Sequence, residues 1–126
     1  MSEMGLVYLC GRMRGIPSIG HDIFDFYAKR LRARGYSVVS PADLDRANGL
    51  SPDGLEHGVP VEILDECIMR DIEAIRECGT LALIPNWIHS KGAKVEVSLA
   101  RFLGKRIIYA DTMSDVPEEH FAGVGL

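Results

Sequence analysis

Short apolar runs alternate along the chain with segments whose apolar residues recur every three or four positions. The short runs predict buried strands, since each is bounded by glycine, proline or polar residues; they are Gly5–Cys10, Tyr36–Ser40, Thr80–Pro85 and Lys105–Ala110. The segments with helical spacing predict amphipathic helices between those strands; they are Gly20–Arg34, Val61–Cys78 and Gly92–Leu103.

This order predicts an α/β fold. We expect a single-domain, flavodoxin-like or Rossmann-like three-layer sandwich with a mainly parallel sheet of about four or five strands. The 126 residues fit one domain over residues 1–126. In such sheets ligands bind beyond the carboxyl ends of the strands. Three segments are therefore expected to surround one crevice, namely Gly11–Gly15, Asp43–Pro60 and Asn86–Gly92.

The remaining segments are predicted to be irregular. Asp43–Pro60 is rich in Gly, Pro, Asp and Asn and is long for a connection, which is typical of a functional lid or a flexible loop. Arg12–Ile19 and Asn86–Lys91 are expected to be shorter loops. The polar tail after Asp111 is compatible with either a frayed or a docked end.

The composition limits the partners of the chain. Hydrophobic residues make up 47%, and the formal net charge is −4, from 14 Lys+Arg and 18 Asp+Glu. A negative charge disfavours a nucleic-acid polymer as partner but leaves room for a small anionic ligand. We expect a basic loop at Arg12 and Arg14 together with an acidic surface; the acidic residues are Asp43, Asp45, Asp53, Glu118 and Glu119.

The sequence carries no signal for a membrane, a metal or a disulfide. No apolar run approaches the roughly 20 residues of a membrane span, and Met1–Met4 does not resemble the start of a signal peptide, so a cytoplasmic location is expected. Cys10, Cys67 and Cys78 lack CxxC spacing and are expected to be buried thiols. The four histidines are scattered, so neither a metal nor another cofactor is expected.

The segment Gly11-Arg12-Met13-Arg14-Gly15 directly follows the first predicted strand. Its glycines allow a tight turn and a close approach of the backbone to a ligand. Its arginines carry forked donors suited to phosphate. The segment contains neither a Walker loop nor GxGxxG, and it is equally compatible with a phosphate cradle and with a plain turn whose arginines face solvent.

Two carboxylates lie on apolar faces of predicted helices. Asp71 falls in the stripe between Ile68 and Ile75, where an unpartnered charge is costly. A functional role is favoured over an ion pair with Arg70 or a loop arginine, and over a position at a stripe edge open to water. Glu96 lies near the start of its helix, where free amides keep a carboxylate ionised. Beside a sugar, such a carboxylate can act as a nucleophile, although an ordinary glutamate at a helix start is commoner.

The loop before that helix contains Trp87 and Ser90-Lys91-Gly92-Ala93. Ser90 with the free amides of a helix start is suited to an anion and to an ordinary N-cap, and taken alone the motif favours the cap. The small side chains of Gly92 and Ala93 allow a ligand to approach, which makes Gly92 a candidate binding residue. Trp87, the single tryptophan, either stacks on a base or closes the core.

Together these motifs resemble the nucleoside 2-deoxyribosyltransferase-like superfamily over nearly the whole chain. The opening Tyr8–Gly15 looks closest to the deoxynucleoside 5′-monophosphate N-glycosidases. The chain is also similar to a family of small phage and bacterial domains of unknown function. In that family a GxMRG opening, a central Arg-Asp and a late SxGAxxE recur; here these are Gly11–Gly15, Arg70-Asp71 and Ser90–Glu96.

The resemblance implies an enzyme that cleaves the N-glycosidic bond of a (deoxy)nucleoside 5′-monophosphate or nucleoside. Hydrolysis or base transfer would proceed through a covalent glycosyl-Glu96 intermediate. Tyr8 would orient Glu96, and Asp71 would bind a sugar hydroxyl or assist proton transfer. The 5′-phosphate would be held by Gly11–Gly15 with Ser90. A homodimer or higher homo-oligomer is implied as well, because related enzymes assemble their sites across subunits.

Two features depart from those enzymes. The transferases bind substrate with a C-terminal Asn from a neighbouring subunit, and the tail Asp111–Leu126 has no Asn. Arg12 stands where the monophosphate glycosidases tend to have Ser. The alternative to an enzyme is a non-catalytic nucleotide-binding module, and a structural or interaction domain comes third.

Overall fold

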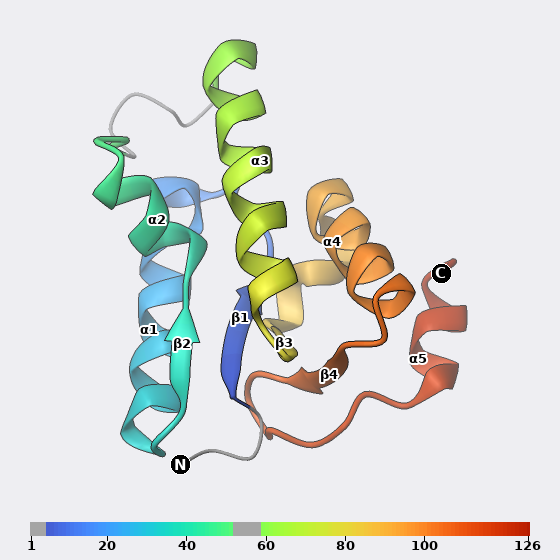
Figure 1. Ribbon diagram of the computed structural model, residues 1–126. Coiled ribbons are helices and arrows are strands. Elements are labelled where there is room, and N and C mark those ends of the chain that lie inside the picture. The colour runs from blue at the N-terminus through green and yellow to red at the C-terminus, as the bar shows by residue number, and fades with distance from the viewer. Residues whose placement is uncertain (1–4, 52–58) are drawn as a thin grey trace.

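A four-stranded parallel sheet organises the computed structural model, which describes residues 5–51 and 59–126 (Figure 1). The strand order is β2-β1-β3-β4; the strands are β1 (Leu6–Cys10), β2 (Ser37–Val39), β3 (Thr80–Leu83) and β4 (Arg106–Tyr109). Tyr8 pairs with Val39 on one side and with Leu81 on the other, so β1 lies inside the sheet. The predicted α/β sandwich with a parallel sheet is confirmed, and the sheet has four strands.

Helices connect the strands and cover both faces of the sheet. They are α1 (His21–Ala33), α2 (Pro41–Ala47), α3 (Val61–Glu77), α4 (Lys91–Phe102) and α5 (Glu118–Gly123), with two short 3-10 helices, η1 (Pro17–Gly20) and η2 (Pro85–His89). None of the helices in the described segments is long and apolar enough to cross a membrane.

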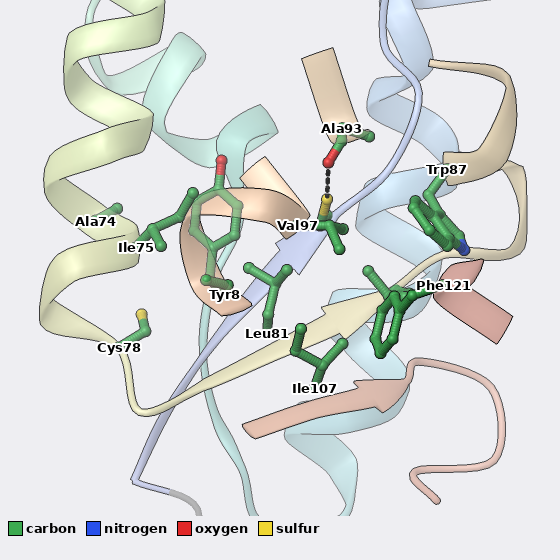
Figure 2. Packing of buried hydrophobic residues seen from close by; sticks show 13 residues of the cluster. Tyr8, Ala74, Ile75, Cys78, Leu81, Trp87, Ala93, Val97, Ile107 and Phe121 are labelled. Atoms are coloured by element: carbon green, nitrogen blue, oxygen red, sulfur yellow. Dashed lines mark hydrogen bonds between the residues drawn. The ribbon is translucent and has the colours of Figure 1, made fainter. Parts of the chain in front are cut away.

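Strand β1 separates two hydrophobic cores, because successive side chains of a strand point to opposite faces. Val7 and Leu9 belong to the core under α1. Tyr8 and Cys10 belong to the core under α3, α4 and α5, whose packing is shown in Figure 2. The three cysteines are buried and free, as predicted.

Several segments predicted to be loops contain helices instead. The segment from Asp43 begins inside α2, because Pro41 occupies the first helical turn, where its fixed φ is favourable. Residues 52–58 of the same segment, Asp53 among them, lie outside the described residues. Arg12–Ile19 ends in η1, and Asn86–Lys91 contains most of η2. The tail is docked rather than frayed, since α5 buries Phe121 against the core.

Candidate active site

A cavity of about 450 Å³ lies between α3 and α4, beside the loop that follows β1. After β1 the chain continues to β2, on one side of the sheet, and after β3 it continues to β4, on the other side. The strand order therefore reverses between β1 and β3. Such a reversal point is a common ligand site in parallel sheets. Most of the predicted site residues line the cavity; they are Gly11, Met13, Arg14, Asp71, Ser90, Gly92 and Glu96.

Side chains of strand β1 hold Glu96 and the first turn of its helix in place. The buried Tyr8 hydroxyl donates a hydrogen bond to Glu96 Oε2 at 2.8 Å. Two residues further along β1, the Cys10 thiol donates to the Ala93 carbonyl at 3.6 Å, the dashed line in Figure 2, and so holds the first turn of α4. Burial raises the pKa of Glu96 to about 7, against the lowering effects of the Tyr8 hydroxyl and the Cys10 thiol.

Asp71 is the second carboxylate on the cavity wall, and it is half-buried on α3. Burial raises its pKa to about 8, and the charges of Glu96 and Asp45 add to the increase, while Arg70 opposes it. The alternative of an ion pair with Arg70 is not formed, because the Arg70 guanidinium turns to Asp45 and Leu44. In the described part of the chain, the Asp71 side chain has no hydrogen-bond partner.

Both carboxyl groups of the cavity have raised pKa values, so each can carry or lose a proton near neutral pH. Glu96, with a pKa of about 7, is ionised in a large fraction of molecules. Asp71, with a pKa of about 8, still holds its proton in most of them. When one of two such groups is ionised and the other protonated, the carboxylate can attack a carbon atom while the carboxylic acid protonates the leaving group.

The N-terminus of α4 and Arg14 together form a site suited to an anion. Ser90 caps the helix by accepting a hydrogen bond from the Ala93 amide at 3.0 Å, which leaves its hydroxyl hydrogen available to a ligand. The Arg14 guanidinium reaches this helix start, since Nη2 lies 3.8 Å from the position of a Cβ added to Gly92. A forked cation beside free amides favours a phosphate or carboxylate.

The loop Gly11–Gly15 is only partly directed at the cavity. Gly11 is required by core packing, because a Cβ there would lie 2.9 Å from the Ile84 Cβ. Arg12 does not line the cavity; its amide donates to Asn86 Oδ1 at 2.9 Å and its Nε donates to the Arg14 carbonyl at 3.2 Å. Gly15, with φ +79°, supplies the turn. Arg12 and Gly15 shape the loop, and Arg14 is the arginine that reaches the cavity.

Trp87 lies in the hydrophobic core and is absent from the described cavity lining. Its ring packs against Phe121 of α5, with ring centroids 6.4 Å apart. Trp87 is therefore not placed to stack on a base in this cavity, contrary to the first of the two alternatives. Trp87 closes the core, the second of the two alternatives, because its large apolar ring is almost fully buried there.

Two contributors to the site were not predicted. Asn86 holds the loop after β1 through the Arg12 amide. Asp45, expected on an acidic surface, is 5% exposed and lines the cavity. The signal available for Asp45 was its helical spacing from Pro41 and Ala42, which are buried on the same face of α2.

Comparison with known proteins places the chain in a family. The model of a family described as "Domain of unknown function (DUF4406)" matches residues 5–109. The chain belongs to this family. The DUF4406 match runs from β1 to β4 and contains every described residue that lines the cavity. No curated protein matches the chain. The DUF4406 description states no activity, so the function has to be inferred from the cavity.

Proposed function

We propose that the chain is an enzyme that cleaves the N-glycosidic bond of a nucleoside 5′-monophosphate or nucleoside, with Glu96 as the nucleophile. The observation that supports this most is the pairing of Glu96 with the buried Tyr8 hydroxyl in a cavity that also holds Asp71. Two carboxyl groups in one cavity, one of them held by a hydrogen bond, are the pair of residues that glycoside cleavage through a covalent intermediate uses.

The reaction has two steps. In the first, a Glu96 oxygen attacks C1′ of the sugar, the C1′–N bond breaks, and the base leaves with the proton of Asp71. In the second, water attacks C1′ of the glycosyl-Glu96 ester, Glu96 leaves as a carboxylate, and Asp71 takes up a proton of the water. A second base in place of water would give transfer.

Release of free base from a panel of nucleosides and 5′-monophosphates, followed by chromatography, tests the proposal. The mass of enzyme quenched during turnover should show a glycosyl adduct on the peptide that contains Glu96. If nucleotides raise the melting temperature but no compound releases a base, the chain is a nucleotide-binding module instead.

We predict a bell-shaped dependence of kcat/KM on pH, with its maximum between about 7 and 8. Activity rises as Glu96, with a pKa of about 7, loses its proton and falls as Asp71, with a pKa of about 8, loses its own. The two apparent values belong to the coupled pair. Because the Tyr8 hydroxyl lowers the pKa of Glu96, Tyr8→Phe should move the acid limb to higher pH. A flat profile would contradict both assignments.

Arg14→Ala is predicted to weaken the binding of phosphate-bearing substrates selectively. Loss of the guanidinium beside the start of α4 should raise KM for 5′-monophosphates by about tenfold, the effect of one exposed charged hydrogen bond. Nucleosides lack the phosphate, so their kcat/KM should be nearly unchanged. Arg30→Ala is a matched control, because Arg30 packs on Phe26 of α1 on the opposite face of the sheet. Equal losses for nucleosides and nucleotides would refute the phosphate role.

A second copy of the chain is the macromolecular partner we propose. Several large apolar side chains of α3 and α4 are exposed; they are Val61, Ile68, Met69, Val95, Phe102 and Leu103. Burial of such side chains in an interface would be favourable. Exposed acids on α3, such as Glu62, would meet exposed bases of α4, such as Lys91, across a two-fold axis. Since Ile68 and Val95 also line the cavity, the second copy would help to close it.

A further inference from the structure

One buried carboxylate of the cavity has no part in the two-step reaction. Asp45, near the end of α2, is 5% exposed and lines the cavity beside Cys67 of α3. Its Oδ2 lies 3.0 Å from His21 Nε2, and its Oδ1 lies 3.5 Å from Arg70 Nη2. A buried carboxylate is expensive without such partners. Here the partners come from α1 and α3, so Asp45 is held from two helices.

The groups that hold Asp45 are themselves fixed. Arg70 donates through Nη1 to the Leu44 carbonyl at 2.8 Å and through Nη2 to Cys67 Sγ at 2.9 Å. The ring of His21 is buried, and its Nδ1 has no partner among the described residues. A hydrogen on Nε2 lets the ring donate to Asp45 Oδ2. The network therefore sets one orientation of the carboxylate.

A carboxylate accepts hydrogen bonds and does not donate them, with about four lone-pair sites on its two oxygens. His21 and Arg70 occupy one site each, and the Cys67 thiol approaches Oδ1 only weakly, at 3.8 Å. Because Asp45 lines the cavity, its remaining capacity is open to a ligand. The ligand group that meets it has to be a donor, since a carbonyl or phosphate oxygen there would be repelled.

The surroundings of Asp45 favour a planar ring over a phosphate. The wall formed by η1, the segment after α2, the segment before α3 and the first half of α3 is apolar; it contains Ile19, Leu50, Val59, Leu64 and Ile68. Ile19 is buried there with a left-handed backbone, φ 43°, which is unusual for a β-branched residue and has to be imposed by its neighbours. The groups suited to an anion gather instead at the start of α4.

We propose that Asp45 is a specificity-determining residue that selects nucleotides whose base carries an exocyclic amino group. The apolar wall holds the ring, and the Asp45 carboxylate accepts a hydrogen bond from the amino group. A base with a carbonyl at that position loses the bond and leaves a buried charge facing an oxygen. This inference rests on the proposed function and names the substrate class within it.

The test compares matched pairs of 5′-monophosphates. Guanine differs from hypoxanthine by one amino group, while adenine and cytosine carry an amino group where hypoxanthine and uracil, respectively, have a carbonyl. The wild type should prefer the amino-bearing member of at least one pair by about tenfold or more in kcat/KM. In Asp45→Asn, whose amide both donates and accepts, that preference should fall to near one. Calorimetric binding in a Glu96→Gln background should give the same ratios without turnover.

Asp43→Asn is the matched control, because Asp43 lies on the same helix but is absent from the described cavity lining, half-buried, and paired with Arg32 and Arg46. It should leave every ratio unchanged. If Asp45→Asn does not fold, the wild-type ratios decide, and ratios near one in all three pairs overturn the inference.

Other outcomes separate this inference from the proposed function. If nucleotides bind and Asp45→Asn leaves the base ratios unchanged, the inference is wrong and the proposed function stands. If the variant alters only the ratio of ribose to deoxyribose substrates, Asp45 meets a sugar hydroxyl, and selection by the base is overturned. If no nucleotide binds, both are overturned.

Discussion

Replacing Glu96 with glutamine is expected to abolish base release while nucleotide binding is retained. Glutamine has the same shape, and its amide oxygen can still accept the hydrogen bond from the Tyr8 hydroxyl, which is 2.8 Å long in the wild type. An amide oxygen is a poor nucleophile, so kcat should fall by at least about 10³-fold. Base release measured by chromatography and binding measured by calorimetry check the two parts.

The matched control for this change is Glu73→Gln. Glu73 is exposed on α3 and forms a loose ion pair, 3.9 Å long, with Arg76. Its replacement removes the same charge outside the cavity and should leave kcat unchanged. Turnover by Glu96→Gln at the wild-type rate would eliminate Glu96 as the nucleophile.

Asp71→Asn is expected to slow catalysis and, at alkaline pH, to stabilise the fold. Asparagine cannot protonate the leaving base, so kcat should fall by about 10²–10⁴-fold. The basic limb of the pH profile, which reports the proton of Asp71, should move or disappear in the variant. Steady-state kinetics across the pH range measure both effects.

The stability effect follows from the pKa of Asp71, which is 3.8 for an ordinary carboxyl group and about 8 in the fold. The folded state binds this proton more tightly than the unfolded state, so wild-type stability falls as the pH rises from about 4 to about 8. The asparagine has no proton to lose. At about pH 8.5 we expect the variant to be more stable by over about 1 kcal/mol, which raises Tm by about 3 °C or more.

Thermal unfolding at several pH values checks this expectation. The difference in Tm should shrink towards about pH 4, where the wild-type carboxyl group is protonated in the folded state. Asp65→Asn, an exposed position on the same helix, should show no such pH dependence. A stabilisation of Asp71→Asn that is independent of pH would point to packing rather than to the cost of a buried charge.

Apolar periodicity was enough to predict the sheet and its long helices. β1 and β3 are short runs buried on both faces, and α3 has 17 residues, so their patterns are complete within the local sequence. α2 was not predicted because its seven residues span barely two turns. α5 is shorter still, and its docking depends on Phe121 meeting a core built by distant residues.

The same distinction applies to the site. Asp71 and Glu96 were predicted because a carboxylate at an apolar position of a helix can be recognised from the neighbouring residues alone. Asp45 was not predicted, because the partners that allow its burial lie 24 and 25 residues away, at His21 and Arg70. Locally it is one acid among several in a polar segment, and only the packing of α1, α2 and α3 makes it part of the cavity.

The position of Trp87 makes the protein convenient to follow by fluorescence. It is the single tryptophan of the chain, and it is enclosed by the core together with Phe121 of α5. Its indole emission depends on the polarity of its surroundings, so the signal reports whether α5 is docked and the core is intact. Because Trp87 is not among the described residues of the cavity wall, this signal is separate from ligand binding. One spectroscopic readout can thus establish that each variant is folded before its activity is compared.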